Sequence, residues 1–180
     1  SAGVLGSTLS ERTSVRYDQF RAALEQNILS NEDRNAWNNL QSGTAFSMLI
    51  NLASNNPNGR GSIVPYLDND GDANNTTIWI TRANAKALGL LSTNDTGKDA
   101  SIGFSSEFNW DFNPTDGINP NSMNFVYVAA HEIGHMLGFV SGIDILDYYS
   151  PPNGNPFPDE DYVYVSPPDR FRFSPESAEH

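Results

Sequence analysis

The chain contains no cysteine, which excludes disulfide bonds and thiolate chemistry. Basic residues are also scarce: 10 Lys and Arg stand against 22 Asp and Glu, and the net charge is −12. Nucleic acids and anionic membranes are bound by basic surfaces, so the composition argues against both as partners. No apolar run is long enough to span a bilayer, which argues against membrane insertion. A length of 180 residues suffices for one domain with its own core.

Histidine is scarce as well, and its placement is the most informative feature of the sequence. Two of the three histidines are His131 and His135, with Glu132 between them, in the pattern His-Glu-x-x-His. On a helix these histidines lie one turn apart on one side, which suits two ligands of a tetrahedral zinc ion. Glu132 is then the candidate general base for hydrolysis. The alternative is a pair of surface histidines on an ordinary helix, which the scarcity of histidine argues against.

The residues around this motif predict a helix. Asn121 or Ser122 can cap its start, and Gly138 can end it. Apolar residues recur at helical spacing and predict one buried face. These residues are Phe125, Val126, Ala129, Ile133 and Leu137.

The first third of the chain predicts two helices after an irregular start. Residues 1–13 are small and polar and predict a loose lead-in. Residues 15–29 have the apolar spacing of an amphipathic helix. Ser30 and Asp33 then resemble a capping box at the start of a second, short helix.

The middle of the chain predicts two strands separated by a helix. Residues 76–80 are rich in β-branched side chains, and Thr81 can cap the helix that follows. Residues 100–112 alternate apolar and polar side chains and predict one strand with an aromatic face. Glu107 and Asp111 on this strand could be imagined as a glycosidase pair, but exposed strand carboxylates explain them better.

A group of carboxylates after the first third of the chain is a candidate calcium site. Asp68, Asp70 and Asp72 alternate with Asn and Gly and could wrap a calcium ion with oxygen ligands. A solvated turn explains the same residues equally well, since the full EF-hand pattern is absent. Residues 159–161 form another acidic cluster, which we expect to be solvated rather than to form a second calcium site.

The metal motif resembles that of the metzincin clan of zinc endopeptidases. His131, Glu132, His135 and Gly138 match the first part of the clan's pattern. Where the clan carries its third zinc ligand, this chain has Ser141, which is a poor ligand for zinc.

Other segments extend the resemblance over much of the chain: residues 81–90, 108–112, 116–118, 131–144 and 169–174. With them, the chain resembles a family of secreted bacterial metalloproteases found in exoproteomes of the PEP-CTERM type. The resemblance implies a third zinc ligand from a His well downstream of the helix, as in leishmanolysin-like peptidases, followed by a Met-turn. No methionine of this chain lies beyond the helix. The resemblance therefore predicts that the chain is a fragment of a longer family member. We expect it to be shortened at the C-terminus first, and the N-terminus is the second place where residues would be missing.

The third zinc ligand stays open at this point. We expect it beyond residue 180, and Asp144 is the first candidate within the chain because it lies nearest in sequence. The remaining candidates are Asp147, Glu160, Glu176 and His180.

The resemblance implies an α/β fold of the metzincin type over residues 1–180. A twisted, mostly parallel sheet with an antiparallel edge strand would pack on the active-site helix. It further implies a secreted zinc endopeptidase that acts on protein or peptide substrates, with Glu132 as general base. The alternatives are a non-catalytic, calcium-stabilised module with a vestigial or structural zinc site, and a zinc hydrolase acting on a small amide.

Overall fold

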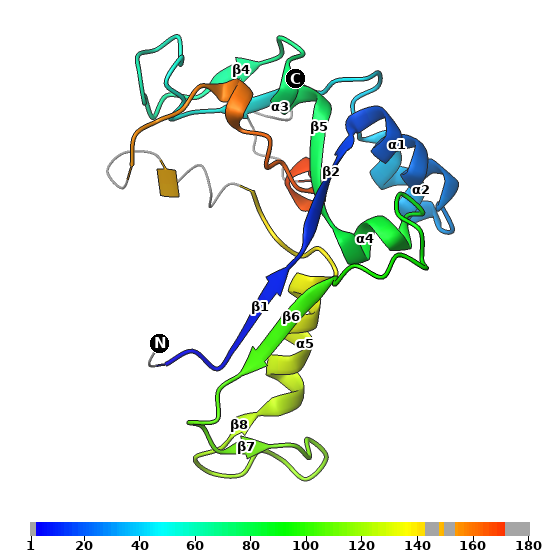
Figure 1. Ribbon diagram of the computed structural model, residues 1–180, viewed down its shortest axis with the longest axis vertical. Helices are drawn as coiled ribbons and strands as arrows, with labels where there is room; N and C mark the ends of the chain where they lie inside the picture. Colours follow the sequence, from blue (N-terminus) through cyan, green and yellow to red (C-terminus); the bar gives the residue numbers. More distant parts are fainter. Residues whose placement is uncertain (1–2, 143–147, 150–153, 172–180) are drawn as a thin grey trace.

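The computed structural model describes residues 3–142, 148–149 and 154–171 (Figure 1). Within these residues the strands are β1 (Gly6–Ser10), β2 (Arg12–Arg16), β3 (Met48–Ile50), β4 (Tyr66–Asp68), β5 (Thr77–Thr81), β6 (Ala100–Phe104), β7 (Trp110–Asp111) and β8 (Met123–Asn124). The helices are α1 (Tyr17–Gln26), α2 (Asn31–Asn38), α3 (Ala73–Thr76), α4 (Arg82–Ala87) and α5 (Phe125–Met136), with 3-10 turns η1 (Asp159–Asp161) and η2 (Pro167–Phe171). The prediction of a mixed α/β fold is confirmed.

The strands form four small sheets of two strands each. β1 pairs with β6, β2 with β5 and β3 with β4, all antiparallel, and only the short β7–β8 pair is parallel. The mostly parallel sheet that the metzincin resemblance implies is therefore not confirmed in the described part of the chain.

The prediction of a loose lead-in over residues 1–13 is wrong. Residues 6–16 form β1 and β2, which follow one another with only Glu11 between them (Figure 1). Their small polar side chains carry little hydrophobic signal, but Gly6, Thr8 and Ser10 point to one face, where small side chains let β1 approach α5 closely. The strand is thus specified by a partner far along the chain rather than by local propensity.

The core lies on β5, α1 and the segments that cover them. Tyr17, Phe20, Phe46, Ile78 and Ile80 are almost fully buried, and the rings of Tyr17 and Phe46 meet edge to face at 4.9 Å between centroids. No side chain of α5 belongs to this core among the residues described. Helix α5 is instead held by β1, β6 and the aromatic rings that pack on Phe125 at its start.

Two of the predicted helix caps are confirmed, and one lies elsewhere. Ser30 and Asp33 form the capping box of α2, and Thr81 accepts the Asn84 N–H at the start of α4. α5 is capped by Asn124, whose side chain accepts the Tyr127 N–H at 3.0 Å, and not by Asn121 or Ser122.

The single strand predicted over residues 100–112 is interrupted. β6 ends at Phe104, and the Ser105 hydroxyl then accepts the Glu107 N–H in a turn. The Trp110 indole donates to the Ser105 carbonyl at 2.8 Å, and the chain resumes as β7. Phe104, before the turn, and Trp110, after it, both pack on Phe125 at the start of α5. The alternating sequence pattern therefore continues although the strand does not.

No helix in the described part of the chain is long and apolar enough to cross a membrane.

Candidate metal centre

The two motif histidines lie side by side on α5. Their Nε2 atoms are 3.0 Å apart, and the rings are nearly perpendicular with centroids separated by 4.6 Å. His131 is exposed and His135 half-buried, so the pair is open to solvent on one side. The prediction that the motif sits on a helix with both imidazoles on one side is confirmed.

The end of α5 fixes the orientation of the second imidazole. The Nδ1 atom of His135 lies 2.8 Å from the Phe139 carbonyl, which can only accept, so Nδ1 carries the proton. In the neutral ring this leaves the lone pair on Nε2, the atom that faces His131. Gly138 makes this turn of the chain with a φ of 111°, a left-handed conformation that favours glycine.

The pair fits a zinc ion in its donor chemistry and spacing. Two nitrogens of a tetrahedral zinc site lie about 3.3 Å apart, given Zn–N bonds of about 2.05 Å. The observed 3.0 Å is close to this value and would need only a small ring rotation. Without a metal, the same distance is satisfied if His131 donates an N–H to the lone pair of His135.

The third ligand is not settled by the described residues. Asp144, Asp147, Glu176 and His180 lie outside them. Glu160 is described, and its carboxylate lies in a different group, with Asp72 and Asp159.

The candidate base, Glu132, is the buried residue of α5. Its side chain is 5% exposed and lies against β1, where the Thr8 hydroxyl is 2.7 Å from Oε2 and 2.9 Å from the Glu132 main-chain carbonyl. Gly6 lies over the other carboxylate oxygen, since a Cβ at that position would be 2.9 Å from Oε1. Ser10 donates to the His135 carbonyl at 3.1 Å, which extends the contact of β1 to the second histidine.

The buried face predicted for this helix is therefore wrong. Val126, Ile133 and Leu137 are 46%, 43% and 49% exposed, whereas Glu132 is buried. The apolar spacing predicts that these residues face the core, but β1 and β6 pack on the face of α5 that carries the Glu132 carboxylate. Sequence periodicity could not identify this face because the residues of β1 that lie against it are Gly6, Thr8 and Ser10, which carry no hydrophobic pattern.

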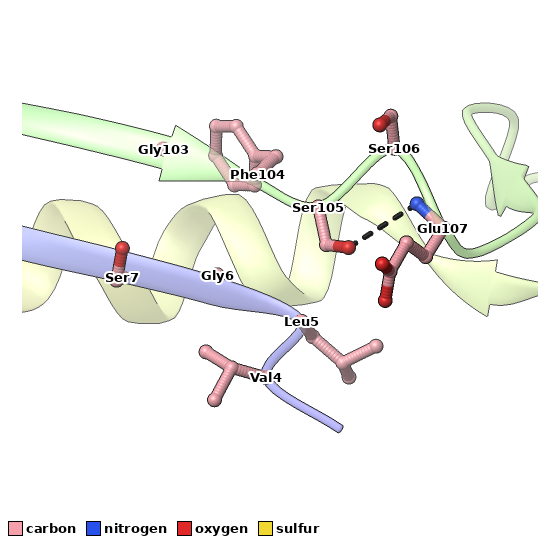
Figure 2. Close-up of a pocket in the computed structure, with 9 residues that line it drawn as sticks. All are labelled: Val4, Leu5, Gly6, Ser7, Gly103, Phe104, Ser105, Ser106 and Glu107. Atoms are coloured by element: carbon pink, nitrogen blue, oxygen red, sulfur yellow. Dashed lines mark hydrogen bonds between the residues drawn. The ribbon is translucent and has the colours of Figure 1, made fainter. Parts of the chain in front are cut away.

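Figure 2 shows an open pocket at the N-terminal end of β1. It has a volume of about 400 Å³ and is lined by Val4, Leu5, Gly6, Ser7, Gly103, Phe104, Ser105, Ser106 and Glu107. Glu107 is exposed there, whereas Asp111 is buried and accepts from Asn113 and Asn119. These backbone bonds from Asn119 and Asn113 lower the pKa of Asp111, so its role is to hold a turn.

A second pocket, of about 340 Å³, lies at the C-terminal end of α5. It is mostly apolar and is lined by Asn84, Leu137, Gly138, Phe139, Pro167, Pro168 and Phe171. Phe139 belongs to this pocket and also supplies the carbonyl that orients His135.

The segment after α5 is held by a residue that the sequence did not single out as functional. The Asp169 carboxylate accepts from the Gly142 N–H and the Ser141 hydroxyl, both at 2.8 Å, and from Ser166 at 2.7 Å. The Ser166 hydroxyl also lies 2.7 Å from the Val140 carbonyl, so its single proton can go to either acceptor, while the Ser166 main-chain N–H donates to Asp169 at 2.9 Å. Asp169 therefore joins the segment that follows α5, at Ser141 and Gly142, to η2.

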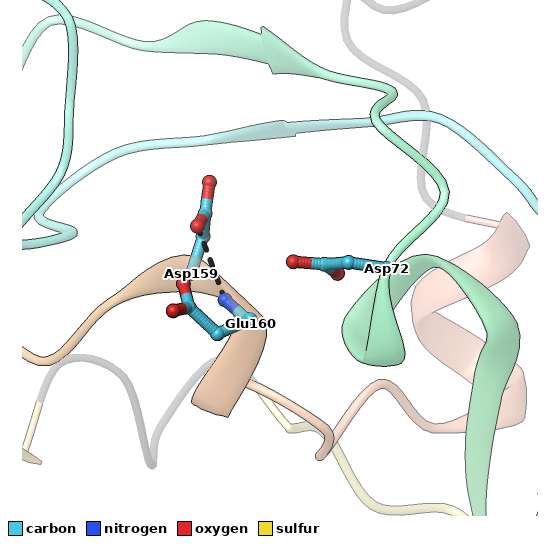
Figure 3. Close-up of side chains that lie close together, drawn as sticks. All are labelled: Asp72, Asp159 and Glu160. Atoms are coloured by element: carbon cyan, nitrogen blue, oxygen red, sulfur yellow. Dashed lines mark hydrogen bonds between the residues drawn. The ribbon is translucent and has the colours of Figure 1, made fainter.

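A second group of titratable side chains lies where α3 meets η1. The carboxylate oxygens of Asp72, Asp159 and Glu160 lie within 4.8 Å of one another, and Figure 3 shows Asp72 pointing from the start of α3 toward the other two. The structure thus joins Asp72 to residues 159 and 160, which we expected to be solvated. Asp68 instead accepts from the amides of Asn74 and Asn75, and Asp70 is exposed.

Two carboxylates of this region have raised pKa values, whereas the pKa of Asp159 is lowered. Burial raises the pKa of Asp68 to about 6; the Asn74 amide opposes this shift, and the charges of Asp159 and Asp70 add to it. Burial also raises the pKa of Asp72 above its ordinary value. Tyr66 donates to Asp159 at 2.5 Å, and burial together with this bond raises the pKa of its hydroxyl.

Comparison of the chain with protein-family models, curated proteins and solved structures gives no match. The functional argument therefore depends on the geometry of the two groups described above.

Proposed function

We propose that this chain carries the catalytic centre of a zinc-dependent endopeptidase. The observation that carries the proposal is the pair of Nε2 atoms of His131 and His135, 3.0 Å apart, with Glu132 between them on the same helix. Zinc bound by such a pair supplies a Lewis acid that polarises a carbonyl and acidifies water. The metzincin resemblance of the motif supports the same reaction class, as does the absence of cysteine as an alternative nucleophile.

Each histidine has a distinct role in this proposal. His131 and His135 hold the metal through Nε2, and the Phe139 carbonyl keeps His135 in the tautomer that leaves Nε2 free to bind. Hydrogen bonds to the distal nitrogen of a ligating His also fix the ring, and their loss typically weakens metal affinity about 10–100-fold.

Glu132 is the proposed general base, and its contacts suit a group that gains and loses a proton. When the carboxylate is ionised, Thr8 donates its single hydroxyl proton to Oε2. When Oε2 is protonated, it can donate to the Thr8 oxygen, and Thr8 can turn to the Glu132 carbonyl 2.9 Å away. The carboxyl thus has a hydrogen-bond partner in both states, so β1 would position it without fixing its charge.

The small β1–β6 sheet favours an extended substrate. In the part of the chain that the structure describes, each of these strands pairs on one side only. A peptide can add to such an edge by main-chain hydrogen bonds, while its side chains enter neighbouring pockets.

The test combines zinc content and peptide hydrolysis for matched variants. Replacing Glu132 with Gln should retain zinc and lower kcat by about 10²–10⁴-fold, because the general base is lost. Replacing His131 with Ala should lower zinc content. Glu25→Gln, which alters an exposed carboxylate on α1, outside the motif and outside the β1–β6 sheet, is the control and should change neither quantity. Unchanged hydrolysis in Glu132→Gln would contradict the proposal.

A second candidate function is a non-catalytic module in which the histidine pair binds zinc for stability. The burial of Glu132 under β1 favours it, since a base at 5% exposure has little access to substrate in this arrangement. Wild-type protein that binds zinc but hydrolyses no peptide would identify this alternative.

A further inference from the structure

In the part of the chain that the structure describes, the acidic group between α3 and η1 forms no ion pair with a basic side chain. Every ion pair in the described residues joins other side chains, and none includes Asp72, Asp159 or Glu160. The three carboxylates belong to segments more than 80 positions apart in sequence, which the fold brings together. The Asp159 carboxylate accepts hydrogen bonds from Tyr66 and Asn55, but no cationic side chain of the described residues pairs with the three carboxylates.

A separate observation points to a missing ligand at the same place. Asn74 is fully buried, and its Oδ1 atom has no hydrogen-bond partner. Its Nδ2 donates to the Asp159 carbonyl at 2.6 Å and to Asp68 Oδ2 at 2.9 Å. Exchanging the oxygen and nitrogen of this amide would place an acceptor against two acceptors, so this orientation is the consistent one.

The geometry of the amide places the unpartnered oxygen close to the acceptors that bind its nitrogen. An amide is planar, and one of its two N–H hydrogens lies on the same side as Oδ1. Because the two hydrogens reach Asp68 and Asp159, Oδ1 must lie beside one of these acceptors and cannot face away from both. A buried acceptor next to other acceptors is costly unless a donor or a cation satisfies it.

We propose that Asp72, Asp159, Glu160 and the Oδ1 atom of Asn74 bind a calcium ion that joins α3 to η1. All four contribute hard oxygen atoms, which calcium takes in flexible coordination, and the donor set offers none of the nitrogen or sulfur that zinc prefers. The ion would compensate the carboxylates and give the buried amide oxygen its partner. This site is separate from the proposed zinc pair and does not depend on the peptidase function.

The experiment begins with the whole chain, from which a chelator has removed bound metal. Calcium is then titrated in, its binding is measured by calorimetry, and its effect on stability is measured by thermal unfolding. About one calcium per chain should bind, and the melting temperature should rise by roughly 5 °C or more at saturating calcium. Asp72→Asn keeps an N-cap for α3, and Glu160→Gln changes an exposed side chain, so both variants should fold. Each should weaken calcium binding by at least about tenfold.

Asp161→Asn is the matched control, because Asp161 is an exposed carboxylate on the same turn and is not part of the group. It should bind calcium as the wild type does. The proposal is overturned if the folded wild type binds no calcium, if magnesium binds more tightly than calcium, or if Asp161→Asn weakens binding as much as Glu160→Gln. None of these readouts requires hydrolysis, so failure of the peptidase proposal would leave the result interpretable.

Discussion

The contact of Gly6 with Glu132 offers a direct test of how β1 lies on α5. In Gly6→Ala, the new Cβ would be 2.9 Å from Glu132 Oε1, 3.0 Å from its Cγ and 3.1 Å from Val128 Cγ1. Oxygen Oε1 can move, but Cγ and Val128 are less free to do so, because Thr8 holds the other carboxylate oxygen. The substitution therefore overpacks the interface between β1 and α5.

The magnitude can be isolated with a control on the paired strand. At Gly103, which lies opposite Ser7 in the sheet, a new Cβ would meet only the Ser7 hydroxyl, at 3.7 Å. Both Gly→Ala changes gain about 0.4–1 kcal/mol by restricting the unfolded chain, so this contribution cancels between them. The difference leaves the steric cost at Gly6, about 1–3 kcal/mol.

Urea unfolding followed by tryptophan fluorescence measures this difference. We expect Gly103→Ala to be as stable as the wild type or slightly more stable. Gly6→Ala should have an unfolding free energy about 1–3 kcal/mol lower than that of Gly103→Ala. The m-values should agree, since both variants expose the same surface on unfolding. Equal unfolding free energies for the two variants, within about 0.5 kcal/mol, would refute the close packing of β1 on Glu132.

Three further changes test other parts of the structure. Thr8→Val removes the hydroxyl that donates to Glu132 and should cost about 1–3 kcal/mol in urea unfolding, whereas Thr8→Ser should recover most of it; equal losses would contradict the hydrogen bond. Burial raises the folded-state pKa of Asp68 to about 6 from 3.8, so the folded protein holds this proton more tightly than the unfolded chain. With a chelator present, raising the pH from about 4 to about 6 should therefore lower the unfolding free energy of the wild type relative to that of Asp68→Asn by up to about 3 kcal/mol. A difference between the two unfolding free energies that does not change with pH would contradict the raised pKa. Ser30→Ala removes the cap of α2 and should lower the unfolding free energy by about 1 kcal/mol, measured by thermal unfolding; no change would show that the cap is dispensable.

The features that sequence predicted correctly are those encoded within a few residues. The spacing of His131 and His135 requires only a helix, and the caps at Ser30 and Thr81 bond to the backbone three residues ahead. Helix periodicity and capping are local, so they survive without knowledge of the tertiary partners.

The features that sequence missed depend on partners far along the chain. Thr8 donates a hydrogen bond to Glu132, 124 positions away in sequence, and the residues around Thr8 do not indicate a strand. Asp72 meets Asp159 and Glu160 only because α3 packs on η1. A run of acidic residues gives the same pattern whether it is solvated or completes a distant group, so its role could not be decided from the sequence.

The long separation between β1 and α5 also sets an order of events during folding. A helix such as α5 can form within about a microsecond, and it brings the two histidines together by itself. The strand that holds Glu132 must first close a loop of more than a hundred residues, and such non-local contacts form much more slowly. During refolding we therefore expect a period in which the two histidines lie side by side but Glu132 between them is not yet positioned.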